Sequence, residues 1–200
     1  MRLEENVTWQ QSRTMTEELL GRLLPITPEN IAALDGREGV YVVTYEGREL
    51  GFGLWSGSNP KVIYVGISKP NSSRHFESGN TGTSTLRRSL GALLQHQLEL
   101  TAVPRCQDPL DNDRYSNYSF DQDSEERLSD WMAKNFQIAF LPVEEEKAQA
   151  VRLAMIDYNA PIFNFQNNPA NKYGAEIKVY RKKCAEEARM ADLKVASVCN

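Results

Sequence analysis

The chain has 200 residues, of which 40% are hydrophobic and 25% are charged, and its net charge is −4. These values are ordinary for one soluble globular domain, with room for appended helices, and they exclude a largely disordered chain. The acidic balance is evidence against a dedicated nucleic-acid coat protein, which would be basic. It does not exclude a nuclease, because local basic patches can act within an acidic chain.

The spacing of apolar residues and the turn residues between them predict nine main elements. In chain order they are helices over 14–24 and 28–35, strands over 39–47 and 61–68, helices over 84–98 and 124–136, a strand over 137–143, and helices over 144–159 and 173–195. Thr16, Ser84 (or Thr85) and Ser124 are the predicted N-caps of their helices. A small mixed sheet covered by helices satisfies this order, and periodicity alone does not choose between α+β and α/β.

The cysteines and the N-terminus indicate the compartment. Cys106, Cys184 and Cys199 are far apart and show no C-x-x-C spacing, so neither a disulfide framework nor a zinc knuckle is indicated. No apolar run reaches the roughly 18 residues that span a bilayer, and the first ten residues lack the apolar stretch of a secretory signal. We therefore expect a reducing, cytoplasmic setting and no membrane partner.

The first candidates for chemistry lie on and after the two adjacent strands. Tyr41 and Tyr64 belong to neighbouring predicted strands, and antiparallel pairing would direct both hydroxyls into a common cleft. Arg74 and His75 follow in a loop rich in serine and asparagine; arginine suits a phosphate and histidine transfers protons near neutral pH. The alternatives are tyrosines that pack within the sheet, a solvated loop arginine and a capping histidine.

Basic residues near two helices are candidates for binding nucleic acid. Arg87 and Arg88 lie in the first turn of the helix over 84–98, and with Arg74 and the helix N-terminus they would form an anion site. Lys178 and Arg181 begin a basic stretch on the last helix, and such groups supply phosphate contacts. The alternative is that exposed cations simply keep the surface soluble.

Four motifs in order resemble the GIY-YIG nuclease superfamily. Gly39-Val40-Tyr41 matches the first strand motif of that family, and Tyr64-Val65-Gly66 matches the second. Arg74 stands about ten residues beyond the second motif, as the family's arginine does, and Pro161-Ile162-Phe163-Asn164 matches its closing P-x-x-N turn. The resemblance covers about residues 38–166.

The resemblance implies an α+β fold with a small mixed or antiparallel three-stranded sheet flanked by helices. It implies an N-terminal helical extension over 1–37, a nuclease domain over 38–168, and a C-terminal helix over 169–200 packed on the same domain. The spacing between the two tyrosines is longer than usual for the family, so we expect an inserted hairpin or loop within 46–60.

The resemblance also implies a metal-dependent endonuclease that hydrolyses phosphodiester bonds in DNA with Mg²⁺ or Mn²⁺. Tyr41 is then expected to activate or position the attacking water, Tyr64 to line the same site, and Arg74 to stabilise charge on the phosphate. His75 is expected to carry protons beside them, and Asn164 to contribute to nucleic-acid binding.

One position departs from the family pattern. The metal-binding glutamate is expected twelve residues before Asn164, where this chain has Arg152, and an arginine cannot ligate Mg²⁺. The candidate replacement carboxylates are Glu145, Glu146 and Asp157 on the same helix, and Glu125 or Glu126 on the preceding one. Two further hypotheses stay open: a catalytically silent nucleic-acid-binding domain, and an interaction protein whose tyrosines belong to the core.

Overall fold

The computed structural model describes residues 7–35, 37–47, 50 and 61–198. Most of the predicted insertion over 46–60 therefore lies outside the described residues. Contacts divide the chain into two compact units. The first unit comprises Met1–Glu46, Ser58–Ser73 and Asn135–Lys172, and the second comprises Gly47–Gly57, Arg74–Lys134 and Tyr173–Asn200.

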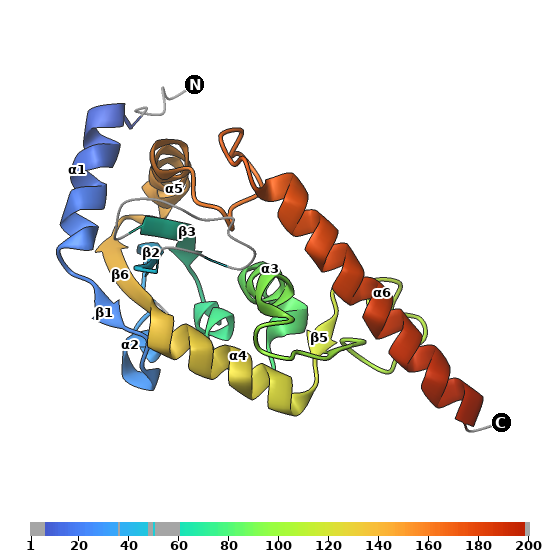
Figure 1. Cartoon of the computed structure of the whole chain (residues 1–200). Coiled ribbons are helices and arrows are strands. Elements are labelled where there is room, and N and C mark those ends of the chain that lie inside the picture. The colour runs from blue at the N-terminus through green and yellow to red at the C-terminus, as the bar shows by residue number, and fades with distance from the viewer. Residues whose placement is uncertain (1–6, 36, 48–49, 51–60, 199–200) are drawn as a thin grey trace. The chain divides into compact units, whose positions relative to one another are not determined.

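The first unit is a four-stranded antiparallel sheet with helices (Figure 1). Its elements are α1 (Trp9–Leu20), β1 (Leu24–Pro25), α2 (Pro28–Ala32), β2 (Gly39–Tyr45), β3 (Lys61–Ser68), β6 (Phe136–Pro142) and α5 (Glu145–Asn159). The strand order is β1-β6-β2-β3, so β2 is central and β3 lies at one edge. The α+β fold and the three predicted strands are confirmed, and the two-residue strand β1 adds a fourth.

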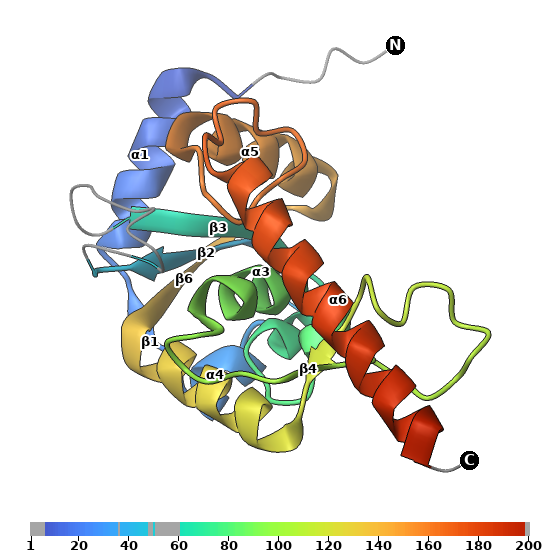
Figure 2. The same ribbon diagram turned by 45° about the vertical axis from the view of Figure 1, so that its right-hand side comes forward.

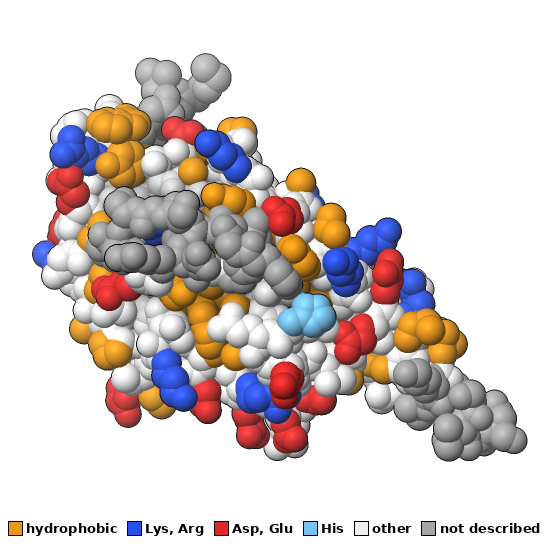
Figure 3. All heavy atoms as spheres, viewed as in Figure 1, with side chains coloured by type: hydrophobic (Ala, Val, Ile, Leu, Met, Phe, Trp, Pro, Cys, Tyr) orange, Lys and Arg blue, Asp and Glu red, His pale blue; other side chains and the backbone are white. Residues whose placement is uncertain are grey.

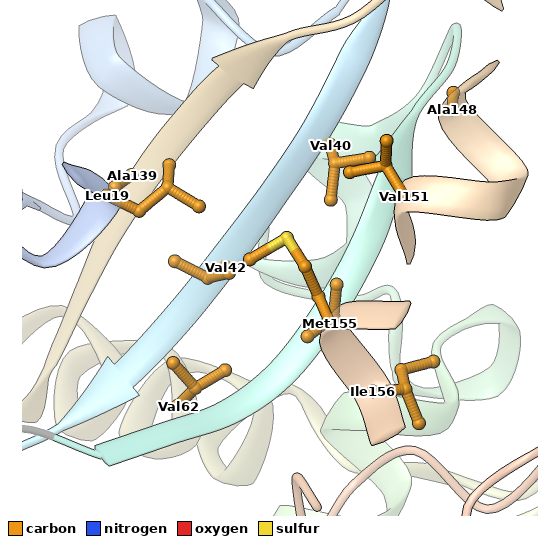
Figure 4. Packing of buried hydrophobic residues seen from close by; sticks show 10 residues of the cluster. Leu19, Val40, Val42, Val62, Ala139, Ala148, Val151, Met155 and Ile156 are labelled. Atoms are coloured by element: carbon orange, nitrogen blue, oxygen red, sulfur yellow. The ribbon is translucent and has the colours of Figure 1, made fainter. Parts of the chain in front are cut away.

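The core of the first unit lies between one face of the sheet and helices α1 and α5. Val40 and Val42 of β2 lie on this face, and Met155 and Val151 of α5 and Leu19 of α1 pack with them (Figure 4). Each such buried side chain stabilises the fold by about 1.5–3 kcal/mol relative to exposure. Because side chains alternate along a strand, the residues between these valines project from the opposite face.

The register between β2 and β3 sets which residues of β3 share that opposite face, and a β-bulge follows at its far end. Val43 pairs with Tyr64, but the next residue of β2, Thr44, pairs with Val62, so Ile63 is the extra residue in β3. Tyr41 pairs with Gly66 and Val43 with Tyr64 in one unbroken register, so Tyr64 projects from the same face as Val43 and Tyr41. The bulge lies beyond this stretch and places Val62 on the core face together with Val65. The tyrosines of the two motifs therefore lie on one side of the sheet, away from the valine core.

The second unit is mostly helical. Its elements are η2 (Thr81–Thr83), α3 (Thr85–Leu94), β4 (Ala102–Val103), β5 (Ser119–Phe120), α4 (Gln122–Asn135) and α6 (Gly174–Val198), and η1 (Ser72–His75) links the two units along the chain. Helices α3 and α6 lie side by side in both views (Figure 2). The predicted cap of α3 is confirmed, since Ser84 Oγ accepts a hydrogen bond from the main-chain N–H of Arg87 at 3.1 Å.

Two other predicted helix caps were wrong. Helix α1 begins earlier than predicted, and Thr16 lies buried inside it. The true cap is Thr8, which forms a reciprocal capping box with Gln11. Helix α4 also begins earlier, so Ser124 is inside the helix and its N–H donates to Asp121 Oδ1 at 2.9 Å. Asp121 therefore caps the first turn of α4.

Candidate active site

The two motif tyrosines form a pair on the sheet. The ring centroids of Tyr41 and Tyr64 are 6.0 Å apart with an angle of 45° between the ring planes. Tyr41 is directly opposite Gly66 in the β2–β3 register, and its ring lies over that glycine. A Cβ atom at Gly66 would lie 2.3 Å from Tyr41 Cζ, so only glycine leaves room for the phenol. The position of Tyr41 in the first motif therefore requires a glycine at position 66 in the second motif.

The glycine of the first motif has a similar role at the other neighbouring strand. A Cβ atom at Gly39 would lie 2.3 Å from the carbonyl oxygen of Leu141 and 2.7 Å from the ring of Phe140. Both of these residues belong to β6, so Gly39 lets β6 approach the start of β2 closely.

Asn164 fixes the strand that carries Tyr64. Its side-chain Oδ1 accepts from the main-chain N–H of Val65 at 2.8 Å, and its Nδ2 donates to the Val65 carbonyl at 2.9 Å. Asn164 is buried. The first unit thus brings Tyr41, Tyr64 and Asn164 together around β3, while a direct contact of Asn164 with nucleic acid stays a prediction.

The loop after β3 is anchored one residue before Arg74. The N–H of Ser73 donates to Asp35 Oδ1 at 3.0 Å, and the Ser73 hydroxyl donates to Asp35 Oδ2 at 2.8 Å. Arg74 follows in η1 and is half-buried. Asp35 was not among the predicted site residues, because an aspartate at the end of a short helix gives no signal that it will hold a loop 38 residues further on.

His75 is buried in the second unit. Its Nδ1 lies 2.8 Å from the hydroxyl of Ser84, the cap of α3. Burial, together with the positive charges of Arg74 and Arg87, lowers the pKa of His75 to about 4. The ring is therefore neutral at neutral pH, and a pKa this far below 7 makes it a weak base there.

This depressed pKa makes stability depend on pH. Above the ordinary pKa of 6.5 the ring is neutral in both the folded and the unfolded chain, so it contributes no pH dependence there. As the pH falls from 6.5 toward about 4, the unfolded chain takes up a proton that the folded chain does not. We expect the free energy of unfolding to fall by about 3 kcal/mol over this window.

Urea unfolding at a series of pH values measures this effect. His75→Gln should remove the fall in the free energy of unfolding that His75 causes between pH 6.5 and about 4. His96→Gln, at the exposed second histidine of the chain, should retain that fall. Equal pH profiles for His75→Gln and the wild type would contradict the assignment.

Arg87 is held inside the second unit by Glu125. Its Nη2 donates to Glu125 Oε2 at 2.6 Å, and the two side chains are 0% and 3% exposed. The same carboxylate accepts from the hydroxyl of Thr81 at 2.9 Å and from the main-chain N–H of Gly79 at 3.2 Å. The predicted contact of Arg87 with nucleic acid stays a prediction, and the observed contacts give this arginine a part in holding the second unit together.

The other predicted phosphate-binding residues differ in exposure. Arg88 is buried, and its Nη1 donates to the carbonyls of Thr81 at 3.0 Å and Gly82 at 2.6 Å. Burial lowers the pKa of Arg88 to about 10, assisted by the positive charge of Arg181. On α6, Lys178 is exposed and Arg181 is half-buried. Lys178 is therefore the most accessible of these cations.

The described residues do not fit the family's metal site at the expected position. Arg152 occupies the place of the glutamate on α5, and the carboxylates nearest to it along that helix, Glu146 and Asp157, are exposed. Glu125 already accepts hydrogen bonds from Arg87 and its neighbours. The described part of the chain brings together no group of three or more His, Cys, Asp or Glu side chains suited to a metal ion.

The surface carries charges of both signs. On the face drawn in Figure 3, lysine and arginine side chains are interspersed with aspartate and glutamate side chains. This agrees with the net charge of −4. Within the described ranges, no helix combines the length and the apolar character needed to cross a bilayer.

Comparison with protein-family models matches residues 50–183 to the GIY-YIG catalytic domain. The match includes Tyr64, Arg74 and Asn164 and begins after Tyr41, so the assignment of Tyr41 rests on its motif and on its pairing with β3. Comparisons with curated proteins and with solved structures found no match.

Proposed function

Since the chain belongs to the GIY-YIG catalytic domain family, we propose that it is an endonuclease that hydrolyses phosphodiester bonds in DNA. The nuclease-type function follows from the family, and the DNA substrate is our proposal. The observation that carries the proposal is the pair of Tyr41 and Tyr64, whose ring centroids lie 6.0 Å apart on one face of the sheet, with Tyr41 over Gly66.

We assign roles to the residues that match the family motifs. Hydrolysis adds water across a P–O bond, so the attacking water must be oriented and must lose a proton. Tyr41 orients and activates this water, and Tyr64 lines the same site. Arg74 stabilises the negative charge that develops on the phosphate oxygens, and His75, adjacent to Arg74, is an additional proton carrier. Lys178 and Arg181 supply contacts to phosphates along the strand.

The family generally depends on a divalent metal, so Mg²⁺ or Mn²⁺ is part of the proposal. Arg152 does not fit such an ion, because the ligands of Mg²⁺ are oxygen atoms.

Arg152 also favours a second candidate function. A domain that keeps the fold but lacks the metal-binding glutamate would bind nucleic acid without cutting it. In such a domain the tyrosine pair would remain a structural feature, and binding would weaken as salt is added.

A cleavage assay on plasmid and branched DNA, with Mg²⁺, with Mn²⁺ and with EDTA, tests the proposal. We expect metal-dependent cutting by the wild type and losses of about 100-fold or more for Tyr64→Phe and Arg74→Ala. Tyr45→Phe is the matched control, because Tyr45 is a buried tyrosine of β2 whose ring packs against Phe136.

The other outcomes separate the alternatives. Salt-sensitive DNA binding without cutting would support the silent binding domain. Neither cutting nor binding would support an interaction protein whose tyrosines belong to the core. Cutting that survives both Tyr64→Phe and Arg74→Ala would refute the assigned roles.

A further inference from the structure

The free edge of β3 is covered by a turn rather than by a strand. Among the described residues β3 is the last strand of the sheet, so no described strand pairs with the outward-facing groups of its main chain. The N–H of Phe163 donates to the Ile63 carbonyl at 3.0 Å, and the side-chain amide of Asn164 exchanges two hydrogen bonds with Val65. The Asn164 amide thus does for Val65 what the peptide group of a neighbouring strand would do.

The side chains of two further asparagines donate hydrogen bonds to that turn. Asn168 Nδ2 donates to the carbonyls of Pro161 at 2.8 Å and Asn164 at 3.0 Å. Asn171 Nδ2 donates to the carbonyls of Ile162 at 2.8 Å and Asn164 at 3.2 Å. Every one of these bonds ends on a main-chain carbonyl of the segment 161–164, so both side chains fix the path of the turn.

The environment of Asn168 indicates that its amide acts as a hydrogen-bond donor to the turn over 161–164. The residue is 7% exposed, and its Oδ1 has no hydrogen-bond partner among the described residues. A buried acceptor without a donor is unfavourable. Both hydrogens of the Asn168 amide are nevertheless engaged, so its contribution is to the turn that carries Asn164.

We infer that Asn168 and Asn171 are positioning residues for the tyrosine pair. They fix the turn, the turn fixes Asn164, and Asn164 fixes Val65, which lies between Tyr64 and Gly66 in β3. The effect of this chain of contacts on catalysis rests on the proposed nuclease function, whereas its effect on the geometry of the tyrosines does not.

The test replaces the donors of Asn168 with little change of shape. Asn168→Asp is nearly isosteric and sets a carboxylate against two carbonyl oxygens. Asn167→Asp is the matched control, because it makes the same charge change at the adjacent, exposed residue. Asn167 has φ of 56°, a left-handed conformation that aspartate also adopts.

The first measurement is ¹⁹F NMR of protein labelled with 3-fluorotyrosine, with Tyr41 and Tyr64 assigned by single Tyr→Phe substitutions. We expect Asn168→Asp to shift or broaden both resonances and to leave that of Tyr118, in the second unit, unchanged. Asn167→Asp should give the wild-type spectrum. Wild-type resonances of both tyrosines in folded Asn168→Asp would overturn the inference. If Asn168→Asp does not fold, Asn171→Ala decides in the same way.

The second measurement is cleavage kinetics. We expect kcat of Asn168→Asp to fall by about 10- to 100-fold with little change in KM, because displaced catalytic groups slow the chemical step. A change in KM alone would overturn the positioning role. If the wild type does not cut DNA, the proposed function fails, and the NMR measurement still decides whether the asparagines position the tyrosines.

Discussion

Glu125→Ala is expected to lower the free energy of unfolding by about 3–5 kcal/mol, because it leaves the guanidinium of Arg87 buried without its counter-charge. Arg87 is fully buried, and its closest acceptor is Glu125 Oε2 at 2.6 Å. The same substitution removes the acceptor for the N–H of Phe120 at 3.3 Å and for the hydroxyl of Thr81 at 2.9 Å. Several buried donors therefore lose a partner at once.

Urea unfolding of Glu125→Ala and of Glu126→Ala measures this loss. Glu126 is the matched control, since it is the exposed glutamate next along α4. We expect a change within about 0.5 kcal/mol for the control. The double variant Glu125→Leu with Arg87→Met removes both charges, so it should be more stable than the two single losses added together. A loss below about 1 kcal/mol for Glu125→Ala would show that Arg87 finds another partner or reaches water.

Gly66→Ala is expected to displace the ring of Tyr41 and to reduce any cleavage activity by about 100-fold. The added methyl would lie 2.3 Å from Cζ and 2.5 Å from the hydroxyl oxygen of Tyr41. Tyr41 is 1% exposed, so its ring has little room to move. Forcing a methyl group into such a contact costs about 1–3 kcal/mol of stability.

Thermal unfolding and near-ultraviolet circular dichroism measure the structural part of this prediction. Gly21→Ala is the control in the same unit, because a Cβ atom there would have its nearest neighbour at an ordinary 3.5 Å. A variant Gly66→Ala with wild-type stability and wild-type tyrosine dichroism would contradict the packing of Tyr41 over Gly66.

The sheet was predictable because its strands carry local signals. Val40, Val42 and Val65 belong to runs of β-branched and aromatic residues, which favour a pleated, buried surface over a helix. The strand over 61–68 is observed at its predicted bounds. Of the missed elements, β1, β4 and β5 have two residues each, too few to show a period. The capping box of Thr8 and Gln11 was visible as a T-x-x-Q pattern and identifies the true start of α1.

The geometry of the candidate site depended on contacts that local patterns do not contain. Motif order singled out Tyr41 and Tyr64, and the register that pairs Tyr41 with Gly66 and Val43 with Tyr64 places both tyrosines on one face. Arg87 reads as an ordinary helix cation, because its partner Glu125 lies 38 residues away. Periodicity reports which face of an element is apolar, and it does not report which distant charge will meet a buried arginine.

The edge of β3 also bears on when this protein becomes functional during synthesis. Strands β2 and β3 leave the ribosome together, but Asn164 follows Val65 by 99 residues. A nascent chain begins to fold from its N-terminus, and distant contacts form only after long loops have closed. Until residues 161–171 emerge, the tyrosine strand lacks the turn that fixes it. The ribosome-bound chain therefore carries the two tyrosine motifs in an unassembled state while it is surrounded by RNA.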